Sequence, residues 1–152
     1  MDRQMIEVLN TIDFAQRYKT LCNQYPFDYY KERFINYNNS CVLDILLNIG
    51  YQVKYLKKEN FQSRKTLSIY QFKYNISIRS GGVELIWYVR KNNKYYAGDS
   101  FSNLEYDLLG LENRRPLPIF RNYEDLKEIL IISYQLYEDM TAAFLKAQGI
   151  SD

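Results

Sequence analysis

The chain has 152 residues, of which 47% are hydrophobic and 25% charged, a balance typical of a folded domain and not of a disordered chain. It contains no histidine, which excludes serine–histidine and cysteine–histidine catalytic pairs and metal sites built on imidazole. No apolar run approaches the roughly 20 residues of a membrane helix, and the N-terminus lacks the apolar core of a secretory signal. With only two cysteines, Cys22 and Cys41, we expect two buried free thiols in a single cytoplasmic domain, residues 1–152.

The formal net charge is +2, but it is unevenly distributed along the chain. Residues 51–98 contain 10 basic and 2 acidic side chains, whereas residues 99–152 contain 5 basic and 10 acidic ones. Such an asymmetry carries information about binding partners and not about the fold. Tyrosine is enriched, with 16 residues. This fits a surface for another protein, but it also fits an AT-rich genome, which raises Tyr, Asn, Lys and Ile together.

Residues 3–22 predict a first helix, because apolar side chains recur there at helical spacing. Pro26 breaks the pattern, and a second helix is expected to follow a cap at Asp28. A polar run before Ser40 weakens this helix and leaves open a division into two, with Ser40 capping the second part. Gly50 follows the last periodic residue and is expected to end the helix.

Alternation of apolar and polar residues predicts four strands, at residues 51–58, 66–79, 83–90 and 94–101. The polar segment 58–65 is expected to be a connection. A shift in the apolar register between Ile69 and Tyr70 predicts a bulge or a bend inside the second strand. Tight turns at 80–82 and 91–94 then give an antiparallel meander.

A short helix at 104–109 is expected to end at the following glycine, and Pro116 and Pro118 confine any later strand to an edge. A long helix then begins at a cap, Asn122, and stops at Gly149. The expected fold class is α+β, with N-terminal helices, an antiparallel β-meander and a long C-terminal helix packed on one face of the sheet.

No catalytic or cofactor motif is present in the sequence. The acidic residues Asp99, Glu105, Asp107 and Glu112 lack the spacing of a calcium loop or a phosphoryl-transfer site, so a solvated or partner-facing rim is expected there. The glycine pair at 81–82 joins two strands and precedes no helix N-terminus, which indicates a hairpin turn and not a phosphate loop. We therefore expect no enzymatic activity, no metal site and no cofactor.

The strand at 66–79 carries an unbroken apolar face, formed by Tyr70, Phe72, Tyr74, Ile76 and Ile78. Such faces are normally buried, which leaves the lysines on the solvent side, where charges also discourage aggregation. Nucleic acid is therefore a disfavoured partner. A nucleic-acid-binding module on the basic aromatic strands of residues 51–98 remains the alternative function, because aromatic rings stack on bases and lysines contact phosphates.

Residues 81–115, GGVELIWYVRKNNKYYAGDSFSNLEYDLLGLENRR, contain a meander strand, a small-residue and acidic segment, and the leucine-rich element Leu108-Leu109-Gly110-Leu111. This run resembles the sheet region of small bacterial immunity proteins that neutralise polymorphic or contact-dependent toxins. The resemblance implies a cytoplasmic, cofactor-free and non-enzymatic inhibitor that binds one cognate toxin domain and occludes its active site. It assigns no individual contact residues, because these families share little at the contact surface.

The charge distribution indicates where such a partner would bind. Acidic groups in the last third of the chain would pair with a basic toxin surface and speed encounter, and aromatic side chains beside them would slow dissociation. A membrane is not an expected partner. The expected partner-binding residues are Tyr88, Tyr95, Tyr96, Asp99, Glu105, Tyr106, Asp107 and Glu112.

Overall fold

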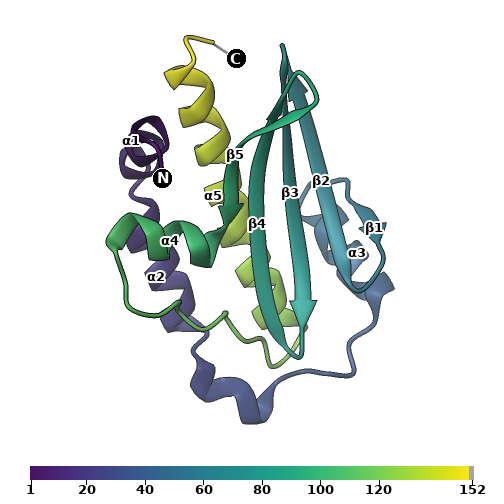
Figure 1. Ribbon diagram of the computed structural model, residues 1–152. Helices are drawn as coiled ribbons and strands as arrows, with labels where there is room; N and C mark the ends of the chain where they lie inside the picture. The colour runs from purple at the N-terminus through teal and green to yellow at the C-terminus, as the bar shows by residue number, and fades with distance from the viewer. Residues whose placement is uncertain (151–152) are drawn as a thin grey trace.

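The computed structural model describes residues 1–150 and has an α+β fold built on one antiparallel sheet (Figure 1). Its five strands lie in the order β1-β2-β3-β4-β5, so that each strand pairs with its neighbours in sequence. From β1 to β5 the strands are Lys54–Leu56, Asn60–Leu67, Tyr70–Arg79, Gly82–Lys91 and Lys94–Ser100. The predicted fold class and the antiparallel meander are both confirmed.

The helices lie on one side of this sheet. They are α1 Arg3–Thr11, α2 Phe14–Gln24, the 3-10 helix η1 Phe27–Glu32, α3 Asn39–Asn48, α4 Phe101–Leu109 and α5 Tyr123–Ala147. In Figure 1, α5 runs behind the strands and α1, α2 and α4 stand beside β5, whereas none of the described helices crosses the front of the sheet. The long C-terminal helix thus covers one sheet face, as predicted, and the opposite face is open.

The strand boundaries differ from the prediction around β2. Segment 58–65, expected to be a polar connection, forms most of β2, and the expected bend at Ile69 is a two-residue turn between β2 and β3. Ser68 adopts a left-handed φ of 57° in this turn. The apolar alternation of β2 is hidden because its covered face contains the polar Ser63 and Lys65 as well as the buried core residue Phe61.

The two later hairpins follow the prediction. Ser80 and Gly81 have φ values of 50° and 81°, and Asn92 and Asn93 have values of 52° and 65°. Two consecutive residues with positive φ match the twist of the flanking strands in a tight hairpin. These turns make the connections short, and short connections enforce the antiparallel order.

The single helix predicted at 3–22 is in fact two helices. Asp13 takes a left-handed φ of 56° between α1 and α2 and ends the first helix without a glycine or a proline. The apolar periodicity continues across this break because both helices bury side chains in the same core, Leu9 from α1 and Tyr18 and Cys22 from α2. Periodicity alone therefore cannot reveal the break.

The second predicted helix is also divided. Pro26, and not Asp28, precedes the short helix η1. Helix α3 is capped by Asn38, whose side chain accepts a hydrogen bond from the Ser40 amide at 2.8 Å, and not by Ser40 itself. Cys41 on α3 is half-buried, in contrast to the buried Cys22, and both thiols are free.

The caps of the last two helices agree better with the prediction. Ser100 accepts a hydrogen bond from the Asn103 amide at 3.2 Å, so α4 begins at Phe101, earlier than expected. Gly110 ends α4 with a φ of 63°. Asn122 caps α5, as predicted, by accepting from the backbone amide three residues later at 2.8 Å.

Aromatic rings fill the layer between the sheet and α5. Phe72 and Tyr74 of β3 and Trp87 of β4 are fully buried. Trp87 Nε1 donates to Thr141 Oγ1 on α5 at 3.2 Å, and Phe144 of α5 packs edge-on against Phe72 with ring centroids 5.7 Å apart. The apolar face of β3 is therefore core, as its alternation predicts.

A second polar contact crosses this core. Ser63 Oγ on β2 and Tyr134 Oη on α5 lie 2.6 Å apart, and both residues are buried. Replacing Ser63 with alanine should lower the free energy of unfolding by about 1–3 kcal/mol, because the buried Tyr134 hydroxyl loses its partner. Adding Tyr134→Phe should recover part of that loss. Urea denaturation of both single variants and the double variant measures the coupling, and strictly additive effects would contradict the contact.

Candidate functional site

Strand β5 forms one edge of the sheet and carries two adjacent exposed aromatic side chains. Tyr95 is 68% exposed and Tyr96 is 40% exposed. The pairing with β4 changes register here, because Val89 pairs with Ala97 whereas Arg90 pairs with Tyr95. Tyr96 is therefore the extra residue of a β-bulge, a distortion that redirects side chains at sheet edges.

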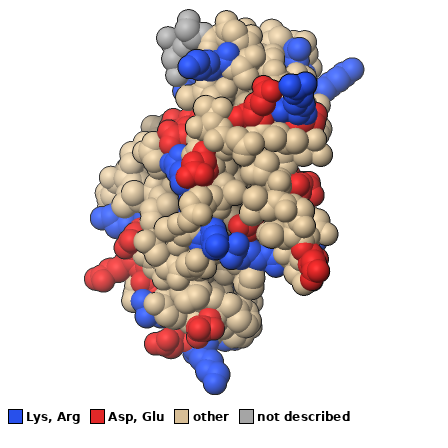
Figure 2. Space-filling model, turned by 90° about the vertical axis from the view of Figure 1, so that its left-hand side faces the viewer, with Lys and Arg blue, Asp and Glu red and all other residues tan. Residues whose placement is uncertain are grey.

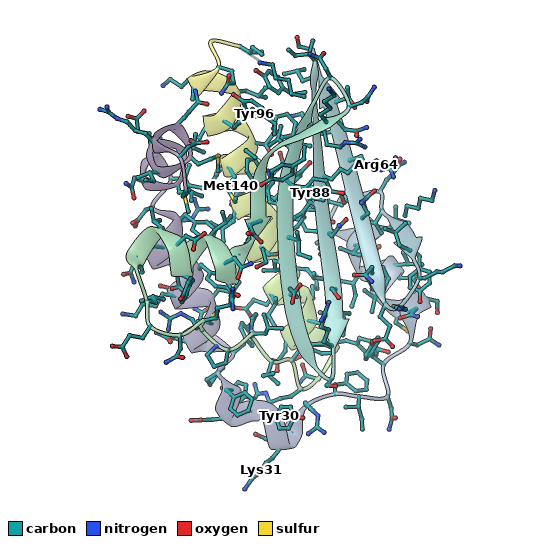
Figure 3. The ribbon with its side chains drawn as sticks, in the orientation of Figure 1. Tyr30, Lys31, Arg64, Tyr88, Tyr96 and Met140 are labelled. Atoms are coloured by element: carbon teal, nitrogen blue, oxygen red, sulfur yellow. The ribbon has the colours of Figure 1, made fainter. Side chains whose placement is uncertain are left out.

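The two tyrosines contact different neighbours. The ring of Tyr96 lies 5.9 Å from that of Phe144 on α5, and the Lys91 ammonium lies 5.2 Å from its centroid. Figure 3 shows Tyr96 near the upper end of the sheet and Tyr88 on the neighbouring strand β4. Tyr95 pairs with Arg90 of β4. Arg90 lies on the same face of β4 as Tyr88, the less buried face, so Tyr95 lies on the open face of the sheet.

Two hollows flank β5. The first, on the open face, is lined by Ile86, Tyr88, Tyr95, Gly98 and Asp99. The second, beside the start of α1, is lined by Met1, Asp2, Met5, Tyr95, Tyr96, Ala97, Gly98, Asp99, Leu104 and Asp107. The fold thus brings together, around one edge strand, the predicted residues Tyr88, Tyr95, Tyr96, Asp99 and Asp107.

Carboxylates surround Tyr95. Burial, and after it the charges of Asp99 and Asp2, raise the pKa of the Tyr95 hydroxyl. Asp99 Oδ1 accepts a hydrogen bond from Asn103 Nδ2 at 2.9 Å, and Asp2 Oδ1 accepts one from the Met5 amide at 2.9 Å. These bonds hold the two carboxylates in place. A negatively charged hollow with an aromatic wall suits the side chain of a lysine or an arginine.

A glycine lets β5 approach β4 closely at this point. Gly98 has a φ of +111°, and a Cβ atom there would lie 2.3 Å from the Trp87 carbonyl oxygen and 2.5 Å from Tyr88 Cα. The Tyr95 hydroxyl donates to the Gly98 carbonyl at 2.6 Å. Gly98 therefore fixes the edge on which Tyr95 is displayed, a role that the sequence pattern does not reveal.

The prediction that Glu105 contacts a partner is wrong, because its side chain is fully buried. Arg115 donates from Nε to both Glu105 carboxylate oxygens at 3.0 Å, and its Nη2 lies 2.9 Å from Oε2. This pairing raises the pKa of Arg115. Tyr18 and Cys22 are buried beside this ion pair. Burial raises the pKa of the Cys22 thiol to about 12. The ion pair joins α4 to the chain that follows it.

The remaining predicted residues, Tyr106 and Glu112, line neither hollow. Tyr106 is half-buried, and the guanidinium of Arg114 lies 5.2 Å from its ring centroid. Glu112 is exposed in the connection after α4. Figure 2 shows basic side chains interspersed among acidic ones on the side of the molecule that carries α1 and α4. The acidic residues of the last third of the chain therefore form no continuous acidic surface on that side.

Asp2 and Met5 are among the residues of the second hollow that the sequence did not predict as contacts. They come from the start of α1, and no sequence pattern connects α1 with β5.

Within residues 1–150, no helix is long and apolar enough to cross a membrane, and no cluster of three or more cysteine or acidic side chains could hold a metal ion. No protein-family model, curated protein or solved structure matches this chain.

Proposed function

We propose that this protein is a non-enzymatic inhibitor that binds a cognate bacterial toxin domain and occludes its active site, like the immunity proteins that residues 81–115 resemble. One observation carries the proposal: Tyr95 and Tyr96 are exposed on an unpaired sheet edge between the carboxylates of Asp2, Asp99 and Asp107. Exposed tyrosines beside fixed charges are typical of protein-binding surfaces.

In this proposal the two kinds of side chain have separate tasks. The carboxylates attract a basic surface on the toxin and raise the rate of association. A lysine or arginine of the toxin enters the hollow between Tyr95 and Asp99, and the tyrosine rings become buried around it. Burial of such rigid aromatic rings slows dissociation. Inhibition then requires only that the toxin's catalytic surface is covered.

The proposal is tested by reversing charge at the β5 edge. The protein is used as bait in lysate of its source cells, the captured protein is identified by mass spectrometry, and the purified pair is titrated by calorimetry. We expect Asp99→Lys with Asp107→Lys to weaken binding about tenfold or more, because each change places a cation opposite a basic partner. The toxin's own activity, measured with and without the variant, should recover in parallel.

A charge-matched control is the pair Asp28→Lys and Asp44→Lys, since both aspartates are exposed on η1 and α3, away from β5. This variant should bind like the unaltered protein. Unchanged affinity of the Asp99 and Asp107 variant at low salt, or an equal loss in the control, would contradict docking at the β5 edge.

A further inference from the structure

The open face of the sheet carries a row of cations that crosses four strands. Lys54 lies on β1, Arg64 on β2, Lys73 on β3 and Arg90 on β4. Figure 3 shows Arg64 and Tyr88 on the strands at the front, with Met140 on α5 behind them. We name these four residues the basic row.

Strand pairing places the members of the basic row on direct or diagonal positions of neighbouring strands. Arg64 and Lys73 are direct cross-strand partners, and the neighbouring pair of β3 and β4 is Gln71 with Arg90. Since adjacent strands lie about 4.8 Å apart, the charges follow one another at short intervals. Lys54 and Arg64 also line one shallow hollow, together with Gln62.

No carboxylate of residues 1–150 pairs with any member of the basic row. The one acidic side chain within β1 to β4 is Glu84, and it lies near Arg79 at the far end of the hairpin, 3.9 Å away. Like charges directly opposite each other destabilise a sheet. Burial, and then the charges of Arg64 and Arg90, lower the pKa of Lys73. An anion on this face would relieve the like-charge repulsion.

Neighbouring side chains hold Arg64 and Lys73 in position. Arg64 Nε donates to Gln62 Oε1 at 2.5 Å, and Gln62 Nε2 donates to Asn75 Oδ1 at 2.7 Å. The Lys73 ammonium lies 5.7 Å from the ring centroid of Tyr88. Arg64 and Lys73 are thus positioned before a ligand binds, and side-chain amides that can hydrogen-bond to base edges lie beside them.

We propose that the open face binds single-stranded nucleic acid, with the basic row contacting successive phosphates. The cations follow one another from strand to strand across an open face, as phosphates follow one another along a sugar–phosphate backbone, and side-chain amides and Tyr88 lie beside them where exposed bases could bind. An acidic protein segment fits less well, because the centres of protein interfaces are depleted in charge and rely on buried apolar anchors. This face adjoins the β5 edge, because Tyr88 also lines the first hollow and Arg90 pairs with Tyr95, but the basic row itself does not depend on the inhibitor function.

The test is fluorescence anisotropy with a labelled oligouridylate of about 12 nucleotides, within the site sizes that such surfaces cover. The unaltered protein should bind it saturably at low salt. The triple variant Arg64→Gln, Lys73→Gln and Arg90→Gln should bind at least about tenfold more weakly. The slope of its log affinity against log salt concentration should be shallower by about 2, because three phosphate contacts are lost. Relief of the like-charge repulsion should leave its thermal midpoint unchanged or raised.

The matched control removes three charges elsewhere, with Lys19→Gln, Lys31→Gln and Lys146→Gln on exposed helical positions. Absence of saturable binding, or an equal loss in the control, would overturn the proposal. Equally tight competition by a polyglutamate peptide would assign the face to an acidic protein segment instead.

Asp99→Lys with Asp107→Lys should not weaken oligouridylate binding, which separates this site from the proposed toxin contact. Should the triple variant fail to fold, Arg64→Gln and Arg90→Gln are measured singly.

Discussion

Replacing Glu105 with alanine is expected to lower the free energy of unfolding by about 3 kcal/mol, because it leaves the charge of Arg115 without a partner beside a new cavity. The Glu105 side chain is fully buried and Arg115 is 23% exposed, so water can compensate only part of the lost pairing. Since small proteins are stable by about 5–15 kcal/mol, this single change removes a large share of the total. Urea denaturation followed by circular dichroism measures it.

Asp107 offers a matched control on the same helix, because its carboxylate is exposed. Asp107→Ala should change stability by no more than about 0.5 kcal/mol. If Glu105→Ala costs no more than Asp107→Ala, the buried ion pair does not hold α4 to the following segment. Glu105→Gln, which keeps the volume and can still accept a hydrogen bond, should be less damaging than the alanine variant.

Replacing Gly98 with alanine is expected to lower the free energy of unfolding by at least about 3 kcal/mol, through backbone strain and overpacking together. The residue has a φ of +111°, and the new methyl group would meet the carbonyl oxygen of Trp87 at 2.3 Å. Because that obstacle is backbone, β5 must move away from β4. The displacement would dismantle both hollows at the edge, so partner binding should be lost together with stability. Amide hydrogen exchange in β5 and denaturation measure the two effects.

Gly110 provides the control, since it also has a positive φ, +63°, but a Cβ atom there meets nothing within 4 Å. Gly110→Ala should cost only the conformational penalty, about 1–2 kcal/mol. Equal costs at Gly98 and Gly110 would show that the close approach of β5 to β4 is not what requires glycine at position 98.

Much of the fold follows from local signals, and the errors have identifiable causes. The tight turns at Gly81 and Asn93 determine the antiparallel meander, because glycine and asparagine tolerate positive φ. Strand β2 is missed because its covered face includes the polar Ser63 and Lys65, and the hydroxyl of the buried Ser63 has its partner, Tyr134, on the distant helix α5. The break at Asp13 is invisible because both flanking helices face one core.

The site is less predictable than the fold, because it depends on contacts between distant segments. Tyr95 and Asp99 can be chosen from the sequence as an aromatic and an acidic residue near a strand end. Glu105 looks equally exposed in the sequence, since only its pairing with Arg115, across the end of α4, compensates its burial. Arg64 and Lys73 become neighbours only through the β2–β3 register, which the misplaced strand conceals.

Trp87 is the only tryptophan of the chain, and its position gives the protein an internal optical probe. The indole is fully buried against α5, so its fluorescence should emit at short wavelength and shift to the red when the sheet and α5 separate. The 16 tyrosines supply it with excitation energy. Because the ring lies on the covered face, a ligand that docks on the open face without disturbing the core leaves this emission unchanged. A spectral change on binding would therefore report that the two layers have moved relative to each other.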